Sequence, residues 1–434
     1  MKKSIRHRAA TLCVLALMAA TTPVWAANYE AGNGQVSDSL GLGTAIGQDA
    51  LAGGYWNGST WVNNGEGQKN TAYGAGSQAG IGRGWGPNLS TTDPNDGYWE
   101  YDRYNTAVGV GAIASGDGVW GATAVGENVW AKADNSTAVG HQSRAMGANS
   151  TAIGMHADAT GTDSTAVGKD AQAKGTNSTA LGVSANAEGT DSMALGQGAY
   201  AAAGTGQKGQ TTAVGTKAQA TEFYSTAIGQ GAKASEVAST AIGHGAIASG
   251  QQSIAIGGLA DTDTVNGKPV EASGNQSVAI GGRALEASTT AIGHASLADG
   301  SASTAVGKSA QATGSNSTAL GSFAEASKSS TTALGNYAKA TGLGGTAVGN
   351  NAQATGSNST AIGVSANAAG TMSTALGVGA NAEGASSTAL GQGTTVYGEN
   401  STALGVGAKT GGEYVDIPDS EDQELVNVAK NATA

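Results

Sequence analysis

Residues 178–191 read STALGVSANAEGTD, and closely similar phrases recur before and after this one. The phrases Ala152–Gly154, Ala166–Gly168 and Ala180–Gly182 follow one another at a constant spacing of fourteen residues. A short repeat at a fixed period predicts a stack of similar supersecondary units, each of which contacts mainly its neighbours. Such an array offers a long surface rather than a catalytic pocket.

Glycine decides between helix and strand for this repeat. Fourteen residues also equal four turns at 3.5 residues per turn, which is typical of a coiled coil. However, Gly182 and Gly189 recur in nearly every unit, and each costs a helix about 1 kcal/mol relative to Ala. Period-two alternation predicts two short strands instead, 178–182 and 184–187, with turns at the two glycines, where a positive φ is cheap. We therefore expect an all-β, parallel β-solenoid of about fourteen-residue coils.

The first strand of the unit carries no charge on either face. Thr179 and Leu181 share one face, and Ser178, Ala180 and Gly182 share the other. Both faces therefore look buried, one inside the coil and one against a partner outside the monomer. We place Thr and the branched apolar residue inside the coil, and Ser, Ala and Gly between chains.

A single coil cannot be stable alone. One buried Leu or Ile contributes about 1.5–3 kcal/mol, whereas fixing each residue of the coil costs at least about 1 kcal/mol in backbone entropy. Parallel stacking of coils about 4.8 Å apart, together with association of chains, is the expected remedy.

Residues 1–26 have the pattern of a secretory signal peptide. A basic start, Lys2–Arg8, precedes the apolar stretch 9–20, and residues 24–26 form a small-residue cleavage site. The only cysteine, Cys13, lies in this segment, so the exported protein needs no disulfide.

Charge limits the partners of the exported chain. Residues 1–26 hold four of the 21 basic residues and none of the 32 acidic ones, which leaves a net charge near −15. This balance argues against nucleic acid and anionic membranes as partners. No run of 18 apolar residues follows the signal, so we expect no transmembrane helix in the exported chain. His141, His244 and His294 each follow the glycine of a repeat, so we interpret them as solvated turn residues and expect no metal and no cofactor.

The phrase Ser-Thr-Ala-Ile/Leu-Gly followed by Ala-x-Ala-x-Gly, as in residues 359–369 and 373–384, resembles the YadA-like head repeat of trimeric autotransporter adhesins of Gram-negative bacteria. The resemblance covers roughly residues 38–408. It implies a left-handed parallel β-roll assembled as a homotrimer. It also implies display on the cell surface and binding to host matrix proteins or cell-surface receptors.

We expect a β-roll head over residues 27–410, interrupted by insertions at 48–105, 197–211 and 258–276. Residues 411–434 are expected to begin a neck, because Gln423–Ala429 is similar to the neck opening of the family. Gln423 and Glu424 stand where a basic residue and Gln are usual. We expect no stalk and no membrane anchor in this chain, and therefore attachment to the outer membrane if an anchor is supplied, and secretion otherwise.

Bulky aromatic residues concentrate where the repeat is interrupted. Every tryptophan after the signal lies between residues 56 and 130. Aromatic side chains flanked by Gly, Asn and Asp on loops supply rigid contact area with polar edges, which is typical of binding anchors. The candidate ligand-binding residues are Tyr55, Trp56, Trp61, Trp85, Trp99 and Tyr101. A cap over the exposed end of the first coil would explain the same residues, and the sequence leaves both explanations open.

The sequence thus favours an adhesive binding protein. A passive structural rod that presents an N-terminal binding tip is the alternative. An enzyme on a β-solenoid would need clustered Asp, Arg and Lys, whereas Arg83, Arg103, Arg144 and Arg283 are scattered. We expect no catalysis.

Overall fold

The computed structural model describes residues 44–47, 50–52, 70–79, 104–116, 119–202, 209–258 and 268–410 with their side chains. It also gives the backbone of six short strands outside these ranges, which are included below. The chain forms two compact units, Met1–Ala171 and Gln172–Ala434. The signal peptide expected at residues 1–26 lies outside the described residues.

Each coil contains a three-residue strand and a shorter, two-residue strand. In the first unit the three-residue strands are β1 (Tyr29–Ala31), β3 (Thr44–Ile46), β7 (Thr71–Tyr73), β9 (Thr106–Val108), β11 (Thr123–Val125), β13 (Thr137–Val139), β15 (Thr151–Ile153) and β17 (Thr165–Val167). The two-residue strands are β2 (Gln35–Val36), β4 (Leu51–Ala52), β8 (Gln78–Ala79), β10 (Ile113–Ala114), β12 (Trp130–Ala131), β14 (Arg144–Ala145) and β16 (Asp158–Ala159). An antiparallel pair, β5 (Tyr55–Trp56) and β6 (Trp61–Val62), lies between β4 and β7 in the sequence.

The second unit repeats this plan. Its three-residue strands are β19 (Thr179–Leu181), β21 (Met193–Leu195), β23 (Thr212–Val214), β25 (Thr226–Ile228), β27 (Thr240–Ile242), β29 (Ile254–Ile256), β31 (Val278–Ile280), β33 (Thr290–Ile292), β35 (Thr304–Val306), β37 (Thr318–Leu320), β39 (Thr332–Leu334), β41 (Thr346–Val348), β43 (Thr360–Ile362), β45 (Thr374–Leu376), β47 (Thr388–Leu390) and β49 (Thr402–Leu404).

The two-residue strands of the second unit are β18 (Gln172–Ala173), β20 (Asn186–Ala187), β22 (Tyr200–Ala201), β24 (Gln219–Ala220), β26 (Lys233–Ala234), β28 (Ile247–Ala248), β30 (Glu271–Ala272), β32 (Arg283–Ala284), β34 (Leu297–Ala298), β36 (Gln311–Ala312), β38 (Glu325–Ala326), β40 (Lys339–Ala340), β42 (Gln353–Ala354), β44 (Asn367–Ala368), β46 (Asn381–Ala382), β48 (Thr395–Val396) and β50 (Lys409–Thr410). An antiparallel pair, β51 (Gly412–Asp416) and β52 (Gln423–Val428), follows.

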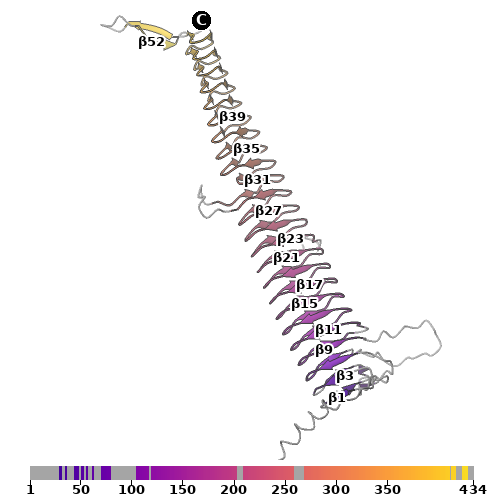
Figure 1. Cartoon of the computed structure of the whole chain (residues 1–434). Helices are drawn as coiled ribbons and strands as arrows, with labels where there is room; N and C mark the ends of the chain where they lie inside the picture. Colours follow the sequence, from indigo (N-terminus) through magenta and orange to yellow (C-terminus); the bar gives the residue numbers. More distant parts are fainter. Residues whose placement is uncertain are drawn as a thin grey trace, which may run out of the picture. The chain divides into compact units, whose positions relative to one another are not determined.

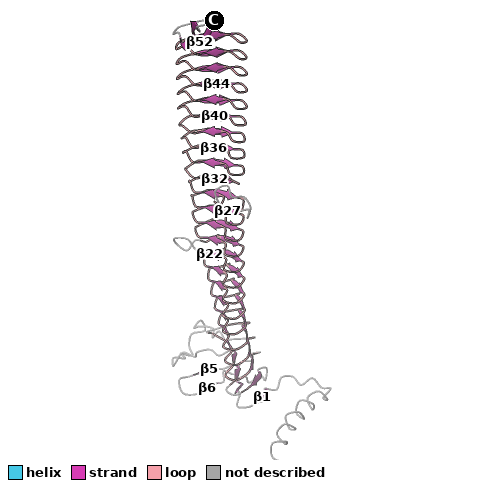
Figure 2. Cartoon of the chain, turned by 90° about the vertical axis from the view of Figure 1, so that its left-hand side faces the viewer, coloured by secondary structure: helices cyan, strands magenta, loops and turns pink. Residues whose placement is uncertain are grey.

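Within each unit the strands of successive coils pair in parallel. The three-residue strands form one ladder, called here the first ladder, and the two-residue strands form the second ladder. In the second unit, Figure 1 shows β31, β35 and β39 of the first ladder stacked along one direction, and Figure 2 shows the same stacking for β36, β40 and β44 of the second. The expected parallel β-solenoid is confirmed.

Both ladders pass the interruptions of the repeat without losing register. In the first unit, Thr44 pairs with Thr71, which pairs with Thr106. In the second unit, Leu195 pairs with Val214 across residues 203–208. Ile256 likewise pairs with Ile280 across residues 259–267. The strands before and after each interruption therefore pair as those of consecutive coils do.

Small side chains fill the interior of each coil. In the repeat at 178–191, Ser178 and Ala180 of the first ladder and Ala185 and Ala187 of the second are fully buried. Leu181 points outward and is 43% exposed. The expectation that Thr and the branched residue fill the coil was therefore wrong, although their sharing of one face was predicted correctly.

The physical reason is the small distance between the two ladders. Among the described residues, the largest fully buried side chains are Val129 and Val396, and no Leu or Ile belongs to that group. A fourteen-residue coil with two short strands leaves room for Ala, Ser and an occasional Val or Thr, so the larger apolar residue must take the outer side.

The turn glycines have two different roles. Gly182 has φ +135°, and a Cβ there would lie 2.6 Å from the carbonyl oxygen of Gly196 in the next coil. Gly175, in the second turn, has no such φ, but a Cβ there would collide with the carbonyl oxygen of Gly189. In that second turn the positive φ belongs to Asn177 and Asp191, so the prediction of a positive φ at both glycines was half wrong.

Candidate functional site

The outer side of the first ladder is an apolar strip. Each strand from β9 to β49 contributes a half-exposed Thr, or an apolar residue in its place, and a Val, Ile or Leu two residues later. Leu334 is 40% exposed and Leu404 is 64% exposed. From β9 to β49, the described three-residue strands hold no charged residue. We call these outward side chains the apolar face.

The apolar face is most hydrophobic next to two interruptions of the repeat. Met193, Ile254 and Val278 replace the usual Thr in β21, β29 and β31. Of these, Met193 and Ile254 are exposed. A half-exposed strip of branched side chains leaves apolar area in water that a partner can cover.

The outer side of the second ladder is polar and is called here the polar face. Because both ladders turn their small residues inward, the polar face and the apolar face point in opposite directions. Its charges pair from one coil to the next. Arg144 bonds to Asp158 in the first unit. In the second unit Lys174 bonds to Glu188 at 3.1 Å, and Arg283 to Glu271 at 2.8 Å.

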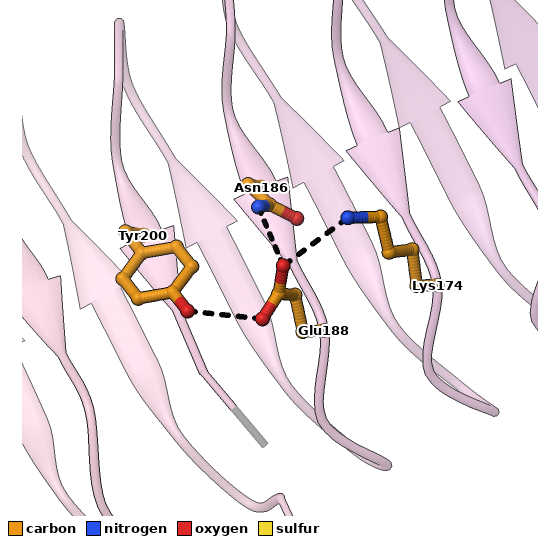
Figure 3. A network of polar contacts seen from close by, with 4 residues as sticks. All are labelled: Lys174, Asn186, Glu188 and Tyr200. Carbon is orange, nitrogen blue, oxygen red and sulfur yellow. Dashed lines mark hydrogen bonds and ion pairs between the residues drawn. The ribbon is translucent and has the colours of Figure 1, made fainter. Parts of the chain in front are cut away.

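Figure 3 shows the most connected group on the polar face of the second unit. One carboxylate oxygen of Glu188 accepts hydrogen bonds from Asn186 at 2.9 Å and Lys174 at 3.1 Å. The other accepts one from the Tyr200 hydroxyl at 2.9 Å. Partial burial alone would raise the pKa of Glu188, but these hydrogen bonds and the Lys174 charge together lower it. Burial and the neighbouring Glu188 carboxylate raise the pKa of Tyr200.

The edges between the two faces carry polar side chains at left-handed backbone positions. In the first unit, the Asn135 amide donates to Asn149 at 3.1 Å, and the Asn149 amide to Asp163 at 2.9 Å. On the other edge, His156 lies 3.1 Å from Asp170, and the ring centroid of His141 is 5.8 Å from that of His156. The side chain of His141 is 42% exposed, as expected for a turn residue.

The described residues contain neither a candidate metal site nor a candidate membrane-spanning helix. Within them no group of three or more His, Cys, Asp or Glu side chains could hold a metal ion. No helix there is long and apolar enough to span a membrane.

The structure brings three of the predicted site residues together at the backbone level. Tyr55 and Trp56 lie in β5, and Trp56 pairs with Trp61 of β6. Their side chains, and the whole of Trp85, Trp99 and Tyr101, lie outside the described residues. Whether these six residues form one site thus stays a prediction.

Trp130 and the apolar face are exposed features that the candidate residues did not include. Trp130 is 37% exposed on the polar face, and its position at the end of the tryptophan-rich stretch was the available signal. The apolar face was missed because its residues were assigned to the interior. The lack of charge correctly indicated burial of the Ser and Ala face, which lies inside the coil. Burial of the other face against a partner stays a prediction.

Comparison with known proteins identifies the repeat. A family profile described as the YadA head domain repeat matches the chain many times between residues 131 and 414. The matched ranges are 131–157, 159–203, 208–260, 271–284, 287–310, 312–338, 340–366 and 368–414. A comparison with curated proteins gave no match. Because the matches cover more than half of the 434 residues, the chain belongs to the family of YadA head domain repeats, which are non-catalytic parts of adhesins.

Proposed function

We propose that this chain is the head of a bacterial cell-surface adhesin in which three copies of a left-handed β-roll pack side by side through their apolar faces. The apolar face is the observation that carries the proposal. It is uncharged from β9 to β49, continuous within each unit, and half-exposed in the single chain. Burial stabilises an assembly by about 25 cal/mol for each Å² of apolar area removed from water.

The opposite side of the coil supports the same arrangement. The polar face already neutralises charges such as Arg283 and Glu271 by pairing them between coils, so it needs no partner to be stable in water. A trimer with apolar faces inward keeps these pairs in contact with solvent. Stability is then inseparable from assembly, because the coil interior alone holds little beyond Ala and Ser.

Export and recognition complete the proposal. Residues 1–26 direct export and residues 411–434 begin the neck, so the head is displayed outside the cell. Host matrix proteins or cell-surface receptors are bound at the aromatic N-terminal region, by Tyr55, Trp56, Trp61, Trp85, Trp99 and Tyr101. Six such residues from each of three copies would give repeated weak contacts, whose combined strength far exceeds that of one.

The test uses residues 27–434 with a trimeric coiled coil fused after residue 434. Binding to cells and to matrix proteins is compared between this protein and the variant Trp56→Ala, Trp61→Ala, Trp99→Ala. We expect binding to fall by more than about 2 kcal/mol, the scale of a hot spot, with little change in melting temperature.

Other outcomes of this experiment would lead to different conclusions. A variant that binds fully would show that the aromatic region is a cap, and would move adhesion to the regular coils. No binding by the unaltered trimer to any matrix protein or cell would favour the passive rod. If the triple variant melts much lower, the three single substitutions decide.

A further inference from the structure

The polar face of the first unit carries a half-exposed tryptophan between two coils. Trp130 takes the outward position of β12, and its register partners are Ile113 on the preceding coil and Arg144 on the following one. The indole is 37% exposed. Elsewhere on this face the same position holds mostly amide and charged side chains, which suit water better than an indole does.

A cation that has no carboxylate partner among the described residues lies over one face of this indole. The Lys132 ammonium is 4.1 Å from the centroid of the Trp130 ring. Arg144 on the next coil is bound to Asp158, whereas no ion pair joins Lys132 to a carboxylate among the described residues. Lys132 therefore keeps hydrogen-bond donors available for an anion next to an apolar ring surface.

The backbone under these side chains offers nothing to an extended peptide. β12 is hydrogen-bonded to β10 on one side and to β14 on the other, so it has no free edge for strand addition. A ligand here must be held by side chains alone, through stacking on the indole and one contact to the ammonium. A sugar ring that carries a carboxylate meets both requirements.

The charge of the whole chain restricts the ligand further. The net charge near −15 of the exported chain repels a polyanion at long range, and one lysine can neutralise one charge only. We propose that Trp130 and Lys132 form a binding site for the end of a glycan whose terminal sugar carries a single carboxylate, with the sugar ring stacked on the indole. This proposal rests on the proposed function in one respect: it assumes the trimer, which leaves three copies of the site on outward polar faces.

The experiment uses the trimeric head described above and two probes on the same polymer at equal density, sialyllactose and lactose. The two probes differ by one acidic sugar. We expect binding to sialyllactose at least about tenfold stronger than to lactose. Trp130→Ala should weaken binding to sialyllactose about tenfold or more, and Trp130→Phe should retain most of it. Lys132→Gln should bring sialyllactose binding down to the level of lactose.

Matched controls lie on the polar face of the second unit. Gln353→Ala and Lys339→Gln remove an amide and a cation from equivalent outward positions of β42 and β40, and both should leave binding unchanged. Equal melting temperatures show that the variants are folded. If Trp130→Ala melts lower than the unaltered trimer, the site is tested by comparing sialyllactose binding of Trp130→Phe and Lys132→Gln with that of the unaltered trimer.

Three results would overturn the site. The first is that the unaltered trimer binds both probes equally or binds neither. The second is that Lys132→Gln binds sialyllactose as the unaltered trimer does. The third is equally strong binding to polyglutamate on the same polymer, which would mean that the site binds an acidic peptide. The result for the proposed function is separate, because binding to cells through Trp56, Trp61 and Trp99 can persist when sialyllactose binding fails.

Discussion

Alanine is the residue on which the coil depends. Ala305 of β35 and Ala312 of β36 are both fully buried, and the same holds for their equivalents in the neighbouring coils. Each coil hydrogen-bonds to the next along both ladders, so one coil cannot widen without disturbing its neighbours. The interior therefore tolerates little added volume.

Replacing Ala305 with Leu should destabilise the head by at least about 1–3 kcal/mol for each site, which is the typical cost of overpacking. In a trimer the change occurs three times. Thermal unfolding followed by circular dichroism measures the effect. Gln311→Lys, in the same coil but exposed on the polar face, is the matched control and should melt with the unaltered protein. Equal melting of the two variants would contradict the assignment of faces.

Two glycines that lie two coils apart allow the effect of close packing to be separated from that of backbone conformation. Gly356 has an ordinary φ, but a Cβ would collide with the carbonyl oxygen of Gly370 in the next coil. Gly379 has φ +66° with open space around the missing Cβ. We expect Gly379→Ala to cost about 1–2 kcal/mol, the usual penalty of a left-handed residue, and Gly356→Ala to cost more. Denaturant unfolding of both variants measures the loss in free energy of unfolding. A larger loss in Gly379→Ala than in Gly356→Ala would contradict the prediction.

The sequence predicted the alternation of side chains correctly and their direction wrongly. That Ala180 and Leu181 lie on opposite faces follows from the period of two. That Leu181 lies outside depends on the distance between the two ladders, which no single repeat specifies. We predicted that Leu lies inside the coil because burial of a larger apolar side chain contributes more free energy. The coil, however, has no space for a Leu side chain.

At the scale of the element, the ladders stabilise the chain through contacts between residues fourteen apart. Lys174 and Glu188 occupy equivalent positions in successive coils, and Tyr200 of the following coil closes the group. Such pairs could not be predicted by reading along one unit. They become visible only once the register is known to be one coil.

The Glu188 group predicts how stability depends on pH. The pKa of Glu188 is lower in the folded chain than its ordinary value of 4.5, so the carboxylate favours folding at pH values above 4.5. This contribution is lost as the pH falls from 4.5 through the lowered folded pKa, because the unfolded chain takes up the proton first. Glu188→Gln should therefore melt lower than the unaltered protein at pH 7, and the difference should shrink as the pH falls below 4.5. Melting temperatures measured at intervals from pH 7 to pH 3 test this.

Glu325→Gln is the matched control for Glu188→Gln, since Glu325 also lies on the polar face, in β38. Its melting curve should follow that of the unaltered protein over the whole pH range. A difference for Glu188→Gln that stays constant down to pH 3 would contradict the role of the carboxylate.

At the scale of the whole molecule, one substitution on each face of the same coil tests the trimer. Val348 ends β41 on the apolar face, and Gln353 begins β42 on the polar face. Val348→Glu would bury a charge between chains, which is strongly unfavourable without a partner. Gln353→Glu leaves its charge in water.

Sedimentation of residues 27–434, with the coiled coil fused after residue 434, should show this difference after the fusion is cleaved. The unaltered head and Gln353→Glu should stay trimeric with cooperative melting. Val348→Glu should dissociate or melt well below them. A folded, cooperative monomer of the unaltered head would refute assembly through the apolar face.

The direction of the hydrogen bonds bears on how such a head resists flow. Within the second unit, bonds such as the one from Thr360 N to Ser373 O join one coil to the next, so a tug along the stack pulls on coils one after another. A fourteen-residue coil drawn straight spans about 48 Å, compared with a rise of about 4.8 Å in the stack. In the proposed adhesin, each coil that opens under load would therefore lengthen about tenfold, so the head would extend one coil at a time.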